Sequence, residues 1–277
     1  MFQGLFGGKK ARRARLRELP LTDEQRRVLE RMVPWYRRFD EDDRRALEGH
    51  VQVFLAEKPF EAVAGFAITD EVRWTIAAHA CLLLMRRTDD CFPTVRSVLV
   101  RPTEYVAESK VPLWNVLGDA QIVDEEQERL GETGQDGVVV LAWDEVAALA
   151  DEEADAINVV VHEFAHELDR EDGSMNGAPV LADAGRRARW ARVCQAEFQK
   201  LQRGDPRRGA LDEYGAEAPD EFFAVATESY FERPLRLRRR HPELYECLRD
   251  FYQIDTAAIL EASREKSPPG DKGSENV

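Results

Sequence analysis

The sequence predicts an α+β protein that is dominated by helices and contains a small sheet. Apolar residues recur at helical spacing over much of the chain, which indicates helices with one buried face. Two runs rich in β-branched residues, 95–100 and 138–143, are typical of strands. With 277 residues, of which 43% are hydrophobic, the chain is long enough to bury a sizeable core.

Helices alternate with extended segments in the first hundred residues. Thr22, followed by Asp23 and Glu24, provides an N-cap and a first acidic turn for a helix that we expect to continue through Tyr36. A second helix follows Asp40 and runs to about residue 54, and a short extended segment covers 60–66. Thr69 and Asp70 then begin a helix that ends near residue 85 and is apolar on nearly all sides, so we expect it to be buried. Pro102 ends the first strand.

The second half opens with the clearest strand of the chain. A polar, turn-rich stretch at 131–137 precedes the strand at 138–143, and Asp144 begins another local element. Further helices are expected at 157–168 and 182–201, with a loop at 173–179 between them. Another helix starts at Pro219, because proline is well tolerated in the first turn.

We expect one domain between a basic arm and a loose tail. The arm is residues 1–20, whose first 17 residues contain no acid but six basic residues: Lys9, Lys10, Arg12, Arg13, Arg15 and Arg17. The domain covers 21–262, with a helical N-terminal lobe at about 21–92 and a second part at about 93–262. Residues 263–277 are rich in Ser, Pro, Gly and charge, so we expect them to be disordered.

Charge and composition exclude several classes of protein. The net charge of 39 − 53 = −14 argues against non-specific nucleic-acid binding, because phosphates are repelled by most of the surface. No apolar run approaches the roughly 20 residues of a membrane span. Phe2, Leu5 and Phe6 precede the basic run, the reverse of a signal peptide. The four cysteines lack CxxC spacing and are typical of reduced packing residues. We therefore expect a cytoplasmic protein without membrane or direct nucleic-acid partners.

Two histidines one helical turn apart carry the chemistry. Positions i and i+4 lie on one face of a helix, so His162 and His166 project together. Two neutral imidazoles placed this way can each bring a nitrogen about 2.0–2.1 Å from one Zn²⁺. Glu163 lies beside them and can take a proton from a water whose pKa zinc lowers. This is the H-E-x-x-H pattern of zinc metallopeptidases, and it predicts one zinc ion per chain.

The pattern is more specific than its length suggests. A shuffled chain of this composition contains it by chance about 2% of the time. The surrounding helix is apolar. The alternative to metal binding is that the two histidines are hydrogen-bonded residues of the core. A purely structural zinc is disfavoured, because such sites have four ligands, usually including cysteines, and no cysteine lies near the motif.

A catalytic zinc needs a third protein ligand, which the motif itself does not supply. Asp172 and Gly173 follow where an extended motif would provide a third histidine, and the spare histidines are His50, His79 and His241. A carboxylate from the helix that starts at Pro219 is the better candidate, since a glutamate on a core face needs a partner. Glu221 and Glu228 are separated by seven residues and lie on the same side of that helix. Spacing alone does not choose between them.

Taken together, these motifs resemble the Mlc titration factor A (MtfA) family, which are zinc peptidases of the gluzincin type. The resemblance covers roughly residues 20–262. It depends on seven segments in the same order: Ser97–Val100 with Pro102, Val138–Asp144, Asn158–Asp169, Asn176–Pro179, Asp212–Ala216, Glu221–Glu228, and Pro242–Tyr245 with Phe251 and Tyr252. Gly215 and Ala218 depart from the usual family residues, but neither belongs to the ligand set.

The resemblance implies a role for each site residue. The zinc ligands fall on His162, His166 and Glu221, and the general base falls on Glu163. Tyr214 matches a tyrosine that can hydrogen-bond the oxyanion of the tetrahedral intermediate. Glu228 would then lie behind the ligands and hydrogen-bond one of them. The implied fold is zincin-like, with a small mixed sheet beside the active-site helix.

The resemblance also implies two kinds of partner. One is a peptide or protein substrate, with aminopeptidase-like action on short peptides, and the strand at 138–142 is either an edge for an extended peptide or an ordinary buried strand. The alternative function is that of a regulatory protein that binds and titrates an Mlc-like transcriptional repressor, with peptidase activity secondary. Candidate surfaces for a repressor are the arginines between 186 and 192, those between 236 and 240, and the basic arm.

Overall fold

The structure is a computed structural model that describes residues 3–63, 65–87, 91–103, 137–151, 157–204 and 210–266. The side chains of residues 3–7 are not part of this description. Its α-helices are α1 (Gln3–Arg17), α2 (Asp23–Met32), α3 (Pro34–Arg38), α4 (Glu41–Glu57), α5 (Asp70–Leu82), α7 (Trp143–Ala148), α8 (Val159–Asp169), α9 (Ala184–Gln202), α10 (Pro219–Glu232), α11 (Pro234–Arg240), α12 (Pro242–Tyr252) and α13 (Thr256–Lys266). Short 3-10 helices are η2 (Arg170–Asp172) and η3 (Glu213–Ala216), and the strands are β1 (Phe60–Ala62), β2 (Ser97–Arg101) and β3 (Val138–Ala142).

The described strands form a parallel sheet in the order β1-β2-β3. Phe60 pairs with Val98, and Val98 pairs with Val139. A mixed sheet was expected from the family resemblance, and for the described strands this was wrong. The reason is the connection between β1 and β2, which contains helix α5 and so can return the chain to the same end of the sheet.

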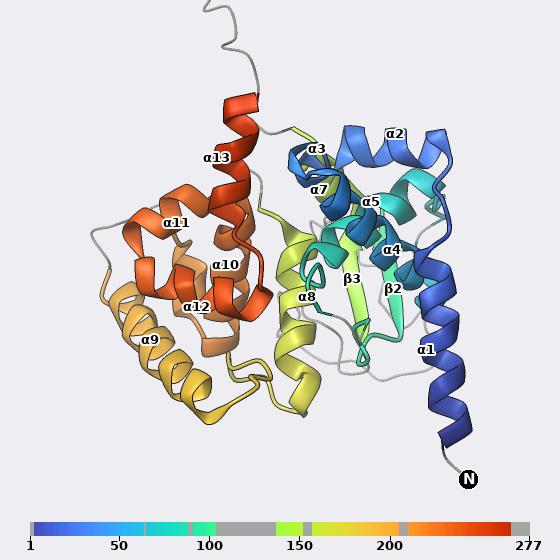
Figure 1. The fold of residues 1–277 in the computed structure, drawn as a ribbon. Coiled ribbons are helices and arrows are strands. Elements are labelled where there is room, and N and C mark those ends of the chain that lie inside the picture. The colour runs from blue at the N-terminus through green and yellow to red at the C-terminus, as the bar shows by residue number, and fades with distance from the viewer. Residues whose placement is uncertain are drawn as a thin grey trace, which may run out of the picture.

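Helix α8 lies at the centre of the molecule. In Figure 1 it separates the sheet and the N-terminal helices from the C-terminal helices α9–α13. It packs against α10, α5 and β3. Phe164 of α8 is fully buried, with its ring centroid 5.6 Å from that of Phe54 and 4.7 Å from that of Phe92. The motif helix is therefore fixed by the core on several sides.

The N-terminal region differs from the sequence prediction in two places. A single helix was expected through Tyr36, but the chain breaks at Val33, because Pro34 starts a new helix and disfavours helical geometry in the residue before it. The basic arm is the helix α1, which packs against α4. Arg13 of α1 is buried, and its guanidinium donates two hydrogen bonds of 2.9 and 2.7 Å to Glu57.

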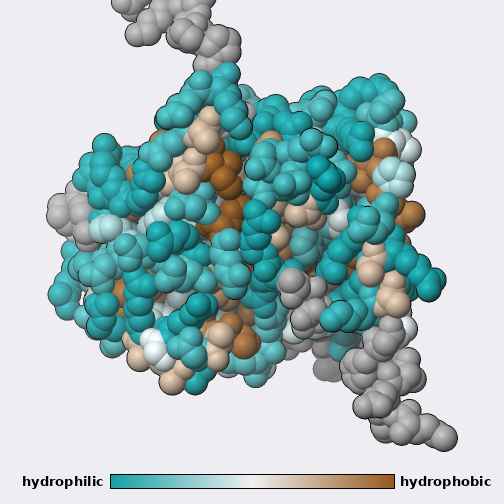
Figure 2. All heavy atoms as spheres, in the orientation of Figure 1, coloured by the Kyte–Doolittle hydropathy of each residue, from teal (hydrophilic) through white to brown (hydrophobic). Residues whose placement is uncertain are grey.

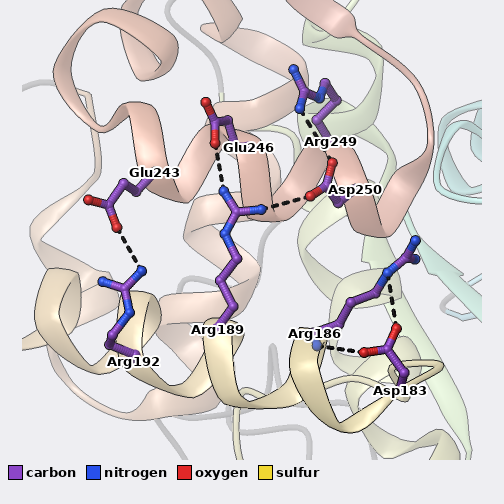
Figure 3. Close-up of polar contacts among 8 residues, drawn as sticks. All are labelled: Asp183, Arg186, Arg189, Arg192, Glu243, Glu246, Arg249 and Asp250. Atoms are coloured by element: carbon purple, nitrogen blue, oxygen red, sulfur yellow. Dashed lines mark hydrogen bonds and ion pairs between the residues drawn. The ribbon is translucent and has the colours of Figure 1, made fainter.

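Helices α9 and α12 are joined by ion pairs (Figure 3). The guanidinium of Arg189 lies 2.6 Å from Glu246 and 2.8 Å from Asp250. Arg192 pairs with Glu243 at 3.0 Å, and Arg186 pairs with Asp183 within its own helix start. These three arginines were part of a candidate surface for a protein partner, and their charges are already paired with acids of the same chain.

The C-terminal helix continues farther than expected. Helix α13 runs through Ser263 to Lys266, four residues into the segment that was expected to be disordered. Residues 267–277, the turn-rich stretch at 131–136 and the acidic residues 152–156 lie outside the described residues.

The face in Figure 2 is mostly hydrophilic, and hydrophobic surface shows mainly in hollows between groups of helices. Among the described residues, no helix is long and apolar enough to cross a bilayer.

Candidate active site

The two motif histidines lie on one face of α8. Asn158 is the N-cap of this helix, and its Oδ1 accepts a 3.1 Å hydrogen bond from the backbone N–H of Val161. One turn later, the Nε2 atoms of His162 and His166 are 3.2 Å apart, with ring centroids 4.9 Å apart. Both side chains are largely buried, with 13% and 5% of their surface exposed.

Glu221 completes a cluster with these histidines. It lies in the first turn of α10, which packs against α8. Its Oε2 is 3.2 Å from Nε2 of His162 and 3.5 Å from Nε2 of His166. The ligand atoms of the three residues all lie within 4.8 Å of one another. The chain thus brings two imidazoles and a carboxylate from two helices to one point.

The geometry of the cluster fits a metal ion. Three ligands that are each 2.0–2.1 Å from one tetrahedral ion stand about 3.3 Å apart, close to the separations in the cluster. Oε2 of Glu221 is buried and accepts no well-directed hydrogen bond within the described structure, so a cation there would give it a partner. Two nitrogens and one oxygen are also the ligand types that zinc prefers.

The electrostatics of the cluster also favour a bound cation. Burial opposes the charged form of His162, but contacts with Glu221 and Glu228 outweigh it and raise the pKa of His162 to about 10. Burial would raise the pKa of Glu221, but the two imidazoles lower it well below its ordinary value. The carboxylates therefore create a field that stabilises positive charge between α8 and α10.

Glu228 lies on the other side of the His162 ring. Its Oε1 is in hydrogen-bond contact with Nδ1 of His162, whereas Glu221 faces Nε2. Burial raises the pKa of Glu228, partly opposed by His162. The sequence left the two glutamates as alternatives for the third ligand. In the structure, Glu221 lies beside both histidines at their Nε2 atoms. Glu228 contacts only His162, at Nδ1.

Glu163 and Tyr214 flank the cluster. Glu163 is only 8% exposed, and its negative charge contributes to raising the pKa of both His162 and Tyr214. Tyr214 is in η3, where Asp212 accepts a 2.9 Å hydrogen bond from its backbone N–H. Its ring centroid is 6.0 Å from that of His162, and 45% of the residue is exposed. Burial and the carboxylate of Glu221 raise the pKa of Tyr214, which keeps the phenol protonated.

The spare histidines lie elsewhere. Nε2 of His79 is 3.3 Å from the backbone oxygen of Met32, and its Nδ1 is 3.1 Å from Nδ2 of Asn158. His241 pairs with Glu197 at 2.7 Å, and burial lowers the pKa of His50 to about 4. Sequence reasoning missed the role of Asn158, which contacts both His79 and Glu232 while it caps α8. An asparagine directly before an apolar helix is the signal that identifies a cap.

Comparison with known proteins gives the family. A family model described as glucose-regulated metallo-peptidase M90 matches residues 8–253. The chain belongs to this metallopeptidase family. An uncharacterized protein of Synechocystis sp. is 36% identical over 249 residues, which is 88% of each chain.

Several relatives of this chain are named Mlc titration factor A. The protein of Pectobacterium atrosepticum is 27% identical over 238 residues, covering 83% of this chain and 86% of that one. The protein of Klebsiella pneumoniae is 29% identical over 207 residues, covering 73% and 76%. The resemblance stated from the sequence motifs is thereby confirmed.

Proposed function

We propose that this M90 protein is a zinc-dependent metallopeptidase with a zincin-like fold of the gluzincin type, in which His162, His166 and Glu221 hold one Zn²⁺. The observation that carries the proposal is the convergence of these three side chains, with a buried carboxylate oxygen that no other described group satisfies. The family, described as a metallo-peptidase, supports the same reaction class.

In this proposal, each neighbouring residue has a separate role in peptide hydrolysis. Bound zinc supplies a Lewis acid that polarises a carbonyl and lowers the pKa of water. Glu163, beside the ligands, takes a proton from the attacking water and gives it to the leaving amine. Tyr214, with its phenol protonated, donates a hydrogen bond to the oxygen on which negative charge develops. Glu228 accepts from Nδ1 of His162 and so leaves Nε2 free as a ligand.

The substrate we propose is a peptide or protein, with aminopeptidase-like action on short peptides. We place the activity in the cytoplasm. The four cysteines are free, three of them buried, as expected of a chain in a reducing compartment.

The test combines metal analysis with hydrolysis of short chromogenic peptides. The wild-type protein is expected to contain one zinc per chain and to cleave at least one peptide. Glu163→Gln should bind zinc normally and lose about 10²–10⁴-fold in kcat. Glu221→Ala should lose zinc. Full activity in Glu163→Gln would refute the assigned base, and unchanged zinc affinity in Glu221→Ala would refute the ligand set.

A second candidate function is regulatory binding of an Mlc-like transcriptional repressor. The names of the relatives favour it. Arg189 and Arg192 of α9 are engaged with α12. The exposed residues Arg187 of α9 and Arg236 and Arg239 of α11 are the better-placed part of the predicted surface. Glu163→Gln separates the two functions, because a regulatory protein would still bind an Mlc-type repressor when its peptidase is inactive.

A further inference from the structure

Asp169 is a fully buried carboxylate at the end of the motif helix, three residues after His166. It accepts three backbone hydrogen bonds from the loop that follows. Oδ2 accepts from the N–H groups of Asn176 at 2.8 Å and Gly177 at 2.7 Å, and Oδ1 accepts from that of Ala178 at 2.8 Å. One side chain of α8 therefore holds three successive peptide groups.

Gly177 is fixed by its second peptide group as well. Its carbonyl oxygen accepts a 2.9 Å hydrogen bond from Nε1 of Trp190, which is buried in α9. Its backbone is in the left-handed region, with φ of 74°, which glycine adopts at little cost. The loop is thus tied to α8 on one side and to α9 on the other.

Gly177 in turn lies against the start of α10. A Cβ on Gly177 would overlap the carbonyl oxygen of Pro219 and stand 2.7 Å from its carbonyl carbon. Pro219 is the first residue of α10, and Glu221 follows two residues later. The N-cap of α10, Ala218, offers no side-chain hydrogen bond, and the contact with Gly177 is one of those that fix the position of the first turn.

We propose that Asp169, Gly177 and Pro219 form a positioning clamp that sets the distance between Glu221 and the histidine pair. The inference rests on the ligand set of the proposed function. The path is continuous: α8 carries His166 and Asp169, Asp169 fixes Gly177, and Gly177 limits how close Pro219, and with it Glu221, approaches α8. None of the three clamp residues belongs to the cluster of His162, His166 and Glu221.

A ligand triad tolerates little displacement. Ligands must be held within about 0.5 Å of their working positions, and loss of an outer supporting group commonly weakens metal affinity 10–100-fold. A change at Gly177 should therefore appear in metal affinity, although the residue lies outside the ligand set.

The loop offers a matched pair of variants. Gly173 is also left-handed, with φ of 90°, but a Cβ there has no atom within 4 Å. Gly177→Ala and Gly173→Ala thus carry the same kind of backbone strain, and only Gly177→Ala adds an overlap with Pro219. Zinc affinity, measured by competition with a chromogenic chelator, is expected to fall at least tenfold in Gly177→Ala and less than threefold in Gly173→Ala.

Asp169→Asn tests the clamp from its other end. The amide keeps the shape of the carboxylate but presents an NH₂ group to N–H donors, so it cannot accept all three hydrogen bonds. Its zinc affinity should fall 10–100-fold. Tyr230→Phe is the control, since it removes a buried hydroxyl of α10 that donates to the backbone oxygen of Ile254. It should lower the thermal midpoint of the metal-free protein and leave zinc affinity unchanged.

Two further readouts separate positioning from a general loss of stability. The visible spectrum of the Co²⁺-loaded protein should change in Gly177→Ala and Asp169→Asn but not in Gly173→Ala or Tyr230→Phe. Thermal unfolding of the metal-free proteins shows whether each variant folds. Equal zinc affinities and spectra in Gly177→Ala and Gly173→Ala would overturn the clamp. If the wild-type protein bound no zinc, or bound it equally well without Glu221, the proposed function itself would fail.

Discussion

Nδ1 of His162 is in hydrogen-bond contact with Glu228, on the side of the ring opposite Glu221. In a neutral imidazole, a proton held on Nδ1 by a carboxylate leaves the lone pair on Nε2, the atom that faces the cluster. His166 differs, because its Nδ1 is buried without a hydrogen-bond partner among the described residues. Of the two proposed ligand histidines, only His162 has a described side chain that fixes its tautomer.

We therefore expect Glu228→Ala to weaken zinc binding 10–100-fold, in the range found for groups that support a ligand histidine. Glu228→Gln should weaken it less, because the amide oxygen can still accept from Nδ1. Competition with a chelator of known affinity measures both. Equal zinc affinity in wild type and Glu228→Ala would contradict the supporting role.

The choice between Glu221 and Glu228 also shows where sequence reasoning stops. Residues seven apart lie on the same side of a helix, so periodicity identifies both and distinguishes neither. What separates them is the placement of α10 against α8, which is a tertiary property. The pair His162 and His166 was predictable because both residues lie on one helix, where spacing alone fixes their geometry.

The difference between local spacing and tertiary placement also explains which features of the fold were predicted. Caps at Thr22 and Thr69 were predicted correctly, because each depends on a side chain and a backbone group three residues apart. The helix in the basic arm was not predicted, since the first 17 residues of the arm contain glycines and no acidic residues. Its contact with α4, through Arg13 and Glu57, joins residues 44 positions apart. The parallel order of the strands likewise depends on a crossover that local patterns do not encode.

Tyr214→Phe is expected to lower kcat about 10²-fold or more, as removal of one hydrogen-bond donor to a developing oxyanion does elsewhere. KM and zinc affinity should change little, because the phenol is outside the cluster of ligand atoms. Steady-state kinetics on a chromogenic peptide, together with zinc content, measures these effects. A purely structural tyrosine would instead lower stability and leave kcat unchanged.

The ion pair between α1 and α4 predicts a pH-dependent stability. Hydrogen bonds from Arg13 lower the pKa of Glu57 below its ordinary value of 4.5, in spite of burial. A carboxyl whose pKa is lower in the folded state contributes stability above its unfolded pKa and loses it as the pH falls through the folded pKa. Glu57→Gln should therefore lower the free energy of unfolding by about 1–2 kcal/mol at pH 7. The difference from wild type should shrink below about pH 4.5.

Urea unfolding at a series of pH values tests this, and limited proteolysis shows whether α1 detaches. Peptidase activity should be unchanged in Glu57→Gln, because α1 lies on the far side of α4 from the C-terminal helices (Figure 1). A difference in unfolding free energy that stayed constant down to pH 3 would contradict the assigned ion pair. A large loss of activity would show instead that the basic arm contributes to catalysis.

Asn158 joins three elements at the start of the motif helix, and its removal should cost more than the loss of a cap. Its side chain caps α8, contacts His79 of α5 and donates a 2.6 Å hydrogen bond to Glu232 of α10. Thr69 caps α5 from an exposed position, so Thr69→Ala measures the cost of a cap alone, about 1 kcal/mol. Asn158→Ala should lower the free energy of unfolding by about 2–4 kcal/mol, because it also removes the contact with the buried His79 and the hydrogen bond to Glu232. Urea unfolding of the metal-free proteins compares the two, and equal costs would show that the contacts with His79 and Glu232 contribute nothing to stability.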